Sequence, residues 1–212
     1  MKIGADKRKP AEHISLKYMA DSLDEFEPGS NRKVLKNLLH ISNVHEIEDL
    51  ELVCYMRTES KLVKSYSSDH IFTFLDIQHI PKLFLGTLYS WAGSIRSVNI
   101  SKGGFTFATA LALPSVIQEF EQKILLKYTP CNGESLKEVA QSIAIVHAEL
   151  LLIHPFREGN GRTARLLANL MARKQGIAAL NFDKINFDEL APKKAFDILW
   201  ELKELKNRDL ES

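Results

Sequence analysis

The chain has 212 residues, which is enough for one sizeable domain and does not require a second core. Its 28 Lys and Arg residues against 27 Asp and Glu residues leave a net charge of +1, which predicts no bulk attraction to nucleic acid or acidic membranes. Two cysteines are too few for a disulfide framework, and neither a secretory signal nor a membrane-length apolar run of ~20 residues is found. We therefore expect a cytoplasmic protein, although a protein injected into a host cell would look the same.

The chain is predicted to be mainly α-helical. Residues 1–40 contain Pro and Gly breaks and are expected to form an arm with a short helix, ahead of one domain over residues 41–208. The first helix of that domain is expected from Ser42, a candidate N-cap, to about Tyr66. Its apolar residues recur at helical spacing, at Val44, Ile47, Leu50, Val53, Met56 and Val63.

A second helix and a hairpin follow. Thr73 and Asp76 form a capping-box pattern, which predicts a helix that ends near residues 91–93. Pro81 lies inside this range, so we expect a kink or a later start there. Residues 95–107 then place β-branched and aromatic residues on either side of a Lys-Gly-Gly turn, which predicts a β-hairpin.

The rest of the chain is predicted to hold four helices. They are expected over about residues 114–128, 135–153 and 160–175, and from between 186 and 192 to about 207. Ser135 with Glu138 provides a capping box for the second of these helices, and Gly176 is expected to end the third.

The chemistry-bearing residues lie in the loop between the helices 135–153 and 160–175. A helix N-terminus has unpaired backbone N–H groups and a partial positive charge, and so binds phosphate. Gly159 and Gly161 let a bulky anion approach the backbone closely, or allow a positive φ. Arg162 and Arg165 share one face of the first turn, where two cations oppose the helix dipole unless an anion is present. The loop therefore predicts a polyphosphate site.

His154 and Glu158 add a base and a metal ligand to this loop. A neutral imidazole, with an ordinary pKa of ~6.5, can accept a proton near neutral pH. A carboxylate among phosphates is repelled unless a cation bridges them, so Glu158 indicates Mg²⁺ or Mn²⁺. This combination favours phosphoryl or nucleotidyl transfer. It is not a Walker loop, because no Gly-Lys-Ser/Thr follows the glycines.

Residues 154–165, HPFREGNGRTAR, resemble the signature of the Fic family, HxFx(D/E)GNGRxxR, at every defined position. Upstream, the residues that resemble the flap of this family are Trp91-Ala92-Gly93, Arg96, Asn99-Ile100, Ser101-Lys102 and Phe105. The likeness covers roughly residues 45–205. It implies a single helical domain in which a β-hairpin flap, at about residues 95–107, lies over the active-site loop. It also implies transfer of AMP from ATP to a Tyr, Thr or Ser hydroxyl of a target protein.

The resemblance implies a role for each matching residue. His154 would deprotonate the target hydroxyl, which would attack the α-phosphate and release pyrophosphate. Glu158 would hold Mg²⁺, and Phe156 would anchor the loop to the core. The implied ATP-binding residues are Gly159, Asn160, Gly161, Arg162 and Arg165. The flap would pair with the target backbone by strand addition, through Asn99, Ile100, Ser101, Lys102, Gly103 and Gly104.

Other interpretations are open at this point. His154 could be a structural helix-end histidine, and Glu158 a carboxylate that stabilises a helix start. A zinc site with His147 is disfavoured because Pro155 breaks the helical register. Phe105 and Phe107 could equally well belong to the core or to the flap. The same scaffold could transfer UMP, GMP, phosphocholine or phosphate, or the chain could be a binding module with a vestigial site.

A second sequence pattern of the Fic family concerns how its members are inhibited. Many Fic proteins are inhibited by a helix with the sequence (S/T)xxxE(G/N), whose Glu pairs with the second motif arginine, here Arg165. In this chain only Glu158 precedes a Gly or Asn, and it belongs to the motif itself. The chain therefore resembles members that are inhibited by a separate small antitoxin, which would make it the toxin of a pair. A degenerate brake at Glu46 or in the C-terminal helix is the alternative.

Overall fold

A computed structural model of the chain describes residues 25–102, 105–177, 180 and 182. Within them the fold is mainly α-helical with one small antiparallel hairpin, as predicted. The helices are α1 (Val44–Ser65), α2 (Phe74–Leu85), α3 (Leu113–Phe120), α4 (Leu126–Tyr128), α5 (Leu136–Ile153) and α6 (Asn160–Ala172). The hairpin strands are β1 (Ser101–Lys102) and β2 (Phe105–Thr106). The last predicted helix, over about residues 186–207, lies outside the described residues.

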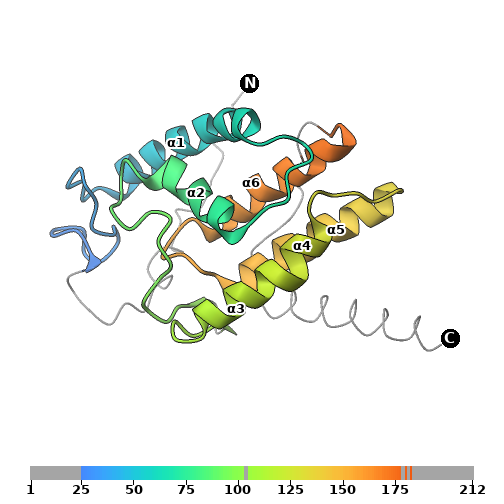
Figure 1. The fold of residues 1–212 in the computed structure, drawn as a ribbon. Coiled ribbons are helices and arrows are strands. Elements are labelled where there is room, and N and C mark those ends of the chain that lie inside the picture. The colour runs from blue at the N-terminus through green and yellow to red at the C-terminus, as the bar shows by residue number, and fades with distance from the viewer. Residues whose placement is uncertain (1–24, 103–104, 178–179, 181, 183–212) are drawn as a thin grey trace, which may run out of the picture.

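The helices pack around one apolar core. α5 packs along α6, α1 packs on α2, α2 also contacts α6, and α3 contacts α5 (Figure 1). Fully buried side chains from three of these helices meet in this core, among them Ile77, Phe84, Leu150 and Leu167. The loop that joins α5 to α6 therefore lies at one end of a packed helix pair, where neighbouring elements can hold it in place.

Local capping explains where several helices begin. Thr73 with Asp76 and Ser135 with Glu138 form the two predicted capping boxes, at the starts of α2 and α5. The predicted Ser42 cap of α1 is wrong. Asn43 caps this helix instead, because its Oδ1 accepts hydrogen bonds from two backbone N–H groups of the first turn, at 2.9 and 3.2 Å.

The apolar stripe expected on α1 is only partly buried. Ile47 packs into the core, whereas Val53, Met56 and Val63 are 43%, 68% and 38% exposed. The fully buried residues of α1 are Ile47, Thr58 and Leu62. The expected stripe therefore combined residues from two adjacent faces of the helix, and only one of these faces meets α2 and α6.

α2 ends earlier than predicted. It runs through Pro81 without the later start that we considered, and it stops at Leu85. Gly86 follows as the C-cap, and the next residues form turns in which the N–H groups of Leu88 and Tyr89 donate to the carbonyl of Leu85. Residues 86–94 are therefore a partly buried turn segment that leads into the flap, and not the last turns of a helix.

The remaining helices agree with their predicted ranges. The stretch from α3 to α4 is continuous, with a π-helical turn over Glu121–Leu125 that the sequence did not predict. After α6, a short 3₁₀ turn over Arg173–Gln175 ends at Gly176, which has the expected left-handed conformation at φ 72°. None of the described helices has the combination of length and apolar character needed to cross a bilayer.

Residues 25–40 lie against the helical domain. Phe26 and Leu35 form an isolated antiparallel bridge, and Val34 and Leu35 are buried in the common core. Glu25 forms an ion pair with Arg157 of the motif loop, at 2.6 Å. The predicted boundary near residue 40 stays a prediction, and most of the predicted arm lies outside the described residues.

Candidate active site

His154 lies at the C-terminus of α5 in the left-handed conformation, with φ 52° and ψ 57°. Its N–H closes the last helical turn on the Leu150 carbonyl at 3.0 Å. Its ring Nδ1 lies 3.2 Å from the Leu151 carbonyl oxygen. A carbonyl can only accept a hydrogen bond, so Nδ1 carries the proton, and the lone pair of the neutral ring is on Nε2. This tautomer is the one that a general base requires.

Phe107 of the flap fixes the plane of the His154 ring. The two rings are stacked, with centroids 3.8 Å apart and planes at 15°. Phe107 is buried, and half-buried Phe105 meets its ring edge-on at 5.3 Å. Phe107 is therefore a flap residue whose ring is buried against His154, and whether the flap has a docking role stays a prediction.

Arg96 connects the flap to the end of α5. Its guanidinium is buried and donates from Nε to the His154 carbonyl at 2.7 Å and from Nη1 to the Val98 carbonyl at 2.6 Å. It also donates from Nη2 to the Ala108 carbonyl. A cation at a helix C-terminus is favoured by the dipole. Burial, and then the Arg157 cation, lower the pKa of Arg96. One side chain thus joins both arms of the flap to the candidate base.

The motif loop is held by Phe156 and Asn160. The Phe156 ring is 1% exposed and stacks on Phe74, with centroids 6.1 Å apart. The Asn160 side chain accepts from the Phe156 N–H at 2.9 Å and donates to the Phe156 carbonyl at 2.8 Å. The loop backbone also bridges to the flap, where Ile95 pairs with Phe156. Asn160 is therefore engaged at both ends of its amide in shaping the loop.

The two glycines of the motif differ in their surroundings. Gly159 precedes α6 with φ 83°, and a Cβ there would lie 3.0 Å from both Leu85 and Phe84. Gly161 lies within the first turn of α6, and a Cβ there would meet no atom within 4 Å. Gly159 is thus required by the fold, whereas Gly161 borders open space at the helix N-terminus.

Arg162 is paired with two carboxylates. Its Nη1 lies 2.6 Å from Glu51 Oε2, and its Nη2 lies 3.5 Å from Glu158 Oε1. Glu51 belongs to α1 and also accepts a 2.6 Å hydrogen bond from the Tyr89 hydroxyl. The sequence argument that cations at this helix end require an anion is therefore met inside the protein, by Glu158 of the motif and by Glu51, which the sequence analysis did not single out.

Arg165 lies one turn further along α6 and close to His147 of α5. Burial, and then the Arg165 cation, lower the pKa of His147 to about 4. The His147 ring is half-buried and stacks on Phe182 at 5.9 Å. His147 is therefore a neutral packing residue near neutral pH.

Glu158 is the one carboxylate within residues 154–165. Among the described residues, no group of three or more His, Cys, Asp and Glu side chains could hold a metal ion, so His147, His154 and Glu158 do not form a zinc site. Mg²⁺ is commonly bound through one or two carboxylates together with substrate phosphates. A single half-buried carboxylate at the N-terminus of α6 fits a metal that arrives with a nucleotide.

The flap presents an open backbone edge. Ser101 and Lys102 form β1, Ile100 is buried, and the Asn99 side chain accepts a 2.8 Å hydrogen bond from the Ala110 N–H. Gly103 and Gly104 lie outside the described residues. The Phe107 N–H donates to the Ile100 carbonyl at 3.1 Å, so Ile100 and Phe107 form a hydrogen-bonded pair. In an antiparallel ladder, hydrogen-bonded and non-hydrogen-bonded residue pairs alternate, so the next pair, Ser101 and Thr106, is non-hydrogen-bonded. Ser101, opposite Thr106, therefore turns its N–H and carbonyl away from β2.

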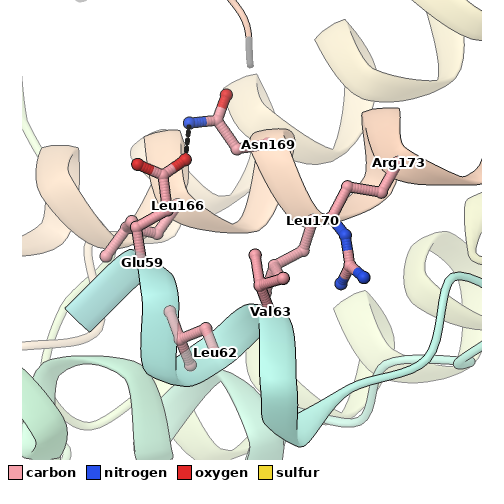
Figure 2. A pocket seen from close by; sticks show the side chains of 7 residues that line it. All are labelled: Glu59, Leu62, Val63, Leu166, Asn169, Leu170 and Arg173. Carbon is pink, nitrogen blue, oxygen red and sulfur yellow. Dashed lines mark hydrogen bonds between the residues drawn. The ribbon is translucent and has the colours of Figure 1, made fainter. Parts of the chain in front are cut away.

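Two hollows in the described structure lie apart from the motif. A cavity of about 10 Å³ between α1 and α6 has room for about one water. Beside it, Asn169 donates a 3.0 Å hydrogen bond to Glu59. Figure 2 shows these two side chains at the cavity. An open hollow of about 650 Å³ lies at the base of the flap, lined by Ser97, Asn99, Thr109, Ala110 and Leu111. Neither includes a residue from 154–165, so the candidate site is defined by the geometry of its side chains.

Sequence reasoning missed Glu51 and Tyr89, and it did not predict the bonds made by Arg96. Arg96 carries a detectable signal, because it belongs to the segment that resembles the Fic flap. Glu51 carries none, since one Glu in an amphipathic helix looks like any surface carboxylate. Only the packing of α1 against α2 and α6 brings it to Arg162.

Comparisons with known proteins agree with this geometry. The model of the Fic/DOC family matches residues 71–172. Protein adenylyltransferase VbhT of Bartonella schoenbuchensis is 30% identical over 162 residues, which cover 74% of this chain and 32% of VbhT, so the chain spans about a third of that relative. Probable protein adenylyltransferase y4lH of Sinorhizobium fredii is 24% identical over 172 residues, covering 81% of this chain and 83% of the relative.

A solved structure shows the same fold. The effector protein BepC of Bartonella tribocorum, crystallised with bound AMPPNP, superposes with a TM-score of 0.65 at 20% identity. The superposition covers 76% of this chain and 82% of BepC. At this identity the likeness concerns the fold alone.

Proposed function

Since this chain belongs to the Fic/DOC family, we propose that it transfers AMP from ATP to a Tyr, Thr or Ser hydroxyl of another protein and releases pyrophosphate. The observation that carries the proposal is the position of His154, with its Nε2 lone pair at the end of α5, beside the glycine-rich start of α6. VbhT and y4lH are named as adenylyltransferases, and BepC binds an ATP analogue, which supports ATP as the donor.

His154 is the proposed base. Its Nε2 takes the proton of the target hydroxyl while the oxygen attacks the α-phosphate and the bond to pyrophosphate breaks. The hydrogen bond from Nδ1 to Leu151 and the stacking on Phe107 hold the ring in one tautomer and one plane. General-base catalysis depends on this orientation, because proton transfer requires hydrogen-bond reach in the transition state.

The phosphates are proposed to bind at the N-terminus of α6. The backbone amides near Gly159 and Gly161 would form the anion hole, and the open space at Gly161 allows close approach. Arg162 would contact the phosphate chain, and Arg165 would reach the γ-phosphate. The contacts of Asn160 with Phe156 favour a bracing role for this residue over a direct phosphate contact.

The metal is proposed to be Mg²⁺ or Mn²⁺, held by Glu158. When bound, such an ion neutralises phosphate charge as pyrophosphate leaves. Glu158 would then hold the ion beside the Arg162 guanidinium, whose Nη2 lies 3.5 Å from Glu158 Oε1.

The target protein is proposed to dock on the flap by strand addition. The outward N–H and carbonyl of Ser101 offer hydrogen bonds to an extended segment, and the hairpin lies directly beside His154 through Phe107. Such pairing would place a side chain of the docked segment next to the base.

We further propose that the chain is a toxin whose inhibitor is a separate small protein. Glu46, the candidate brake in α1, is exposed in the first helical turn, and the α1 carboxylate that contacts a motif arginine is Glu51. Expression of the chain alone should slow bacterial growth, and His154→Ala should abolish the effect. A purified chain that becomes active only when Glu46 is replaced would show that the brake is internal.

The activity is tested by incubating the protein and a lysate with ATP labelled on either the α- or the γ-phosphate, followed by mass spectrometry of the modified proteins. Retention of the α label with loss of the γ label supports AMP transfer. Retention of the γ label alone indicates phosphate transfer, and competition by UTP or GTP tests the nucleotide preference. Absence of any His154-dependent label leaves the binding-module interpretation.

A further inference from the structure

The two carboxylates around Arg162 hold it unequally. Glu51 approaches Nη1 at 2.6 Å, a short charge-assisted contact, whereas Glu158 lies 3.5 Å from Nη2. The three side chains are 13% to 19% exposed, so water screens these pairs less than it screens a surface ion pair. The Arg162 guanidinium is therefore drawn mainly towards α1, although Glu158 is its neighbour one turn back along the chain.

Glu51 is itself held in place. The Tyr89 hydroxyl donates to Glu51 Oε1 at 2.6 Å, and the buried Tyr89 ring stacks on Trp91 at 4.6 Å. Burial, and then the Glu51 carboxylate, raise the pKa of Tyr89, so the hydroxyl keeps its proton and remains a donor. The Arg162 guanidinium, which Glu51 contacts, also lies over the Phe84 ring, 5.1 Å from its centre. These contacts define one position for the Glu51 carboxylate.

We propose that Glu51 is a positioning residue that draws Arg162 towards α1, weakens its ion pair with Glu158 and so favours binding of a nucleotide-borne divalent cation at the Glu158 carboxylate. The inference rests on the proposed function and adds to it a residue of α1. Glu158 lies in the loop just before α6, and its ion pair with Arg162 is already present at 3.5 Å. Opposite charges attract, so without Glu51 we expect this pair to shorten and strengthen. The cation must then compete with Arg162 for the same carboxylate.

The test measures ATP binding by calorimetry at a series of Mg²⁺ concentrations, and so requires no target protein. Glu51→Gln should raise the Mg²⁺ concentration for half-maximal ATP binding by about three- to tenfold, the range typical of coupled neighbouring residues. ATP binding in excess chelator should not weaken. The matched control is Glu59→Gln, which removes a carboxylate from the same helix at a residue that accepts a hydrogen bond from Asn169 of α6 (Figure 2). It should leave the Mg²⁺ midpoint unchanged.

A double-mutant cycle separates positioning from a general loss of structure. In an Arg162→Gln background, Glu51→Gln should cause no further shift of the Mg²⁺ midpoint. Tyr89→Phe, which keeps every charge, should shift the midpoint in the same direction by a smaller factor and serves if Glu51→Gln fails to fold. The proposal is overturned if folded Glu51→Gln and Tyr89→Phe leave the Mg²⁺ midpoint unchanged or lower it. It is also overturned if Glu51→Gln shifts the midpoint as much in the Arg162→Gln background as in the wild type. A wild-type chain that binds Mg²⁺ and ATP but labels no protein refutes the proposed transfer and leaves this test valid.

Discussion

The motif loop and the flap meet at His154, but they are held in different ways. The loop is fixed by its own buried groups, with Phe156 packed on Phe74 and its backbone bonded at both ends to the Asn160 amide. The flap has two strands of two residues each, and much of it is half-buried or exposed. It depends on Arg96, a buried cation that donates to carbonyls of both of its arms and of the α5 end.

This difference suits two different tasks. Phosphoryl transfer depends on positioning and electrostatics, so the groups that face the phosphates gain from a rigid loop. Recognition by strand addition needs unpaired backbone groups at an accessible edge. In the proposed function the chain provides both beside one imidazole, because Phe107 and Arg96 contact His154 and no described residue outside β2 pairs with the backbone of β1.

The largest effect is expected where the two regions meet. His154→Ala should reduce protein labelling by at least about 10²–10⁴-fold, the usual contribution of a general base, because no other group takes the proton. ATP binding by calorimetry should remain near the wild-type value, since the α6 N-terminus is unchanged. Labelling at the wild-type rate would show that His154 is not the base.

Substitution of the two motif glycines tests whether the loop combines a rigid part, at Gly159, with a ligand-facing part, at Gly161. Gly159→Ala should lower the free energy of unfolding by about 2–4 kcal/mol, because it adds a left-handed Ala and a contact at 3.0 Å with Leu85 and Phe84. Gly161→Ala should leave the stability unchanged or raise it by up to about 1 kcal/mol. Urea denaturation measures both.

The same pair of variants tests the anion hole. Although it is stable, Gly161→Ala should weaken ATP binding in calorimetry, because its methyl group occupies the open space where phosphates approach the backbone. If this variant binds ATP as tightly as the wild type, the anion does not approach the helix at Gly161.

The flap is tested through its outward backbone. Ser101→Pro removes an N–H that points away from β2, so it should reduce protein labelling by about tenfold or more through the loss of a docking hydrogen bond and of strand geometry. Ser101→Ala keeps the N–H and should behave as the wild type. Both variants should bind ATP normally, and a parallel loss of ATP binding in Ser101→Pro would assign the flap a structural role.

The smallest effect is expected at His147 of α5, outside the motif loop. Its pKa is lowered from 6.5 to about 4 in the folded chain, so between these values the unfolded chain binds more protons, and stability falls as the pH decreases. His147→Gln should therefore lose less stability than the wild type between pH 7 and pH 5, by about 2 kcal/mol in urea denaturation. The control is the same substitution at exposed His45, and an equal loss in wild type and His147→Gln would contradict the buried neutral ring.

Sequence alone was sufficient where the determining contacts are local. The capping boxes of α2 and α5, the left-handed Gly176 after α6, and the hairpin all depend on residues within a few positions of each other, and each was predicted. One of the errors was also local, where two neighbours compete for the N-cap of α1. Asn43 and Ser42 are both good N-caps, and the position of the helix start depends on how α1 packs.

The tertiary structure decided the contacts that give the site residues their surroundings. Glu51 reaches Arg162 across 111 positions, Arg96 reaches the His154 carbonyl across 58, and Phe107 reaches the His154 ring across 47. No spacing rule encodes such pairs, because they arise from the packing of α1 and of the flap against the α5–α6 pair. Sequence therefore determined the candidate active-site loop through its motif, and folding determined which distant side chains contact His154 and pair with the charges of the loop.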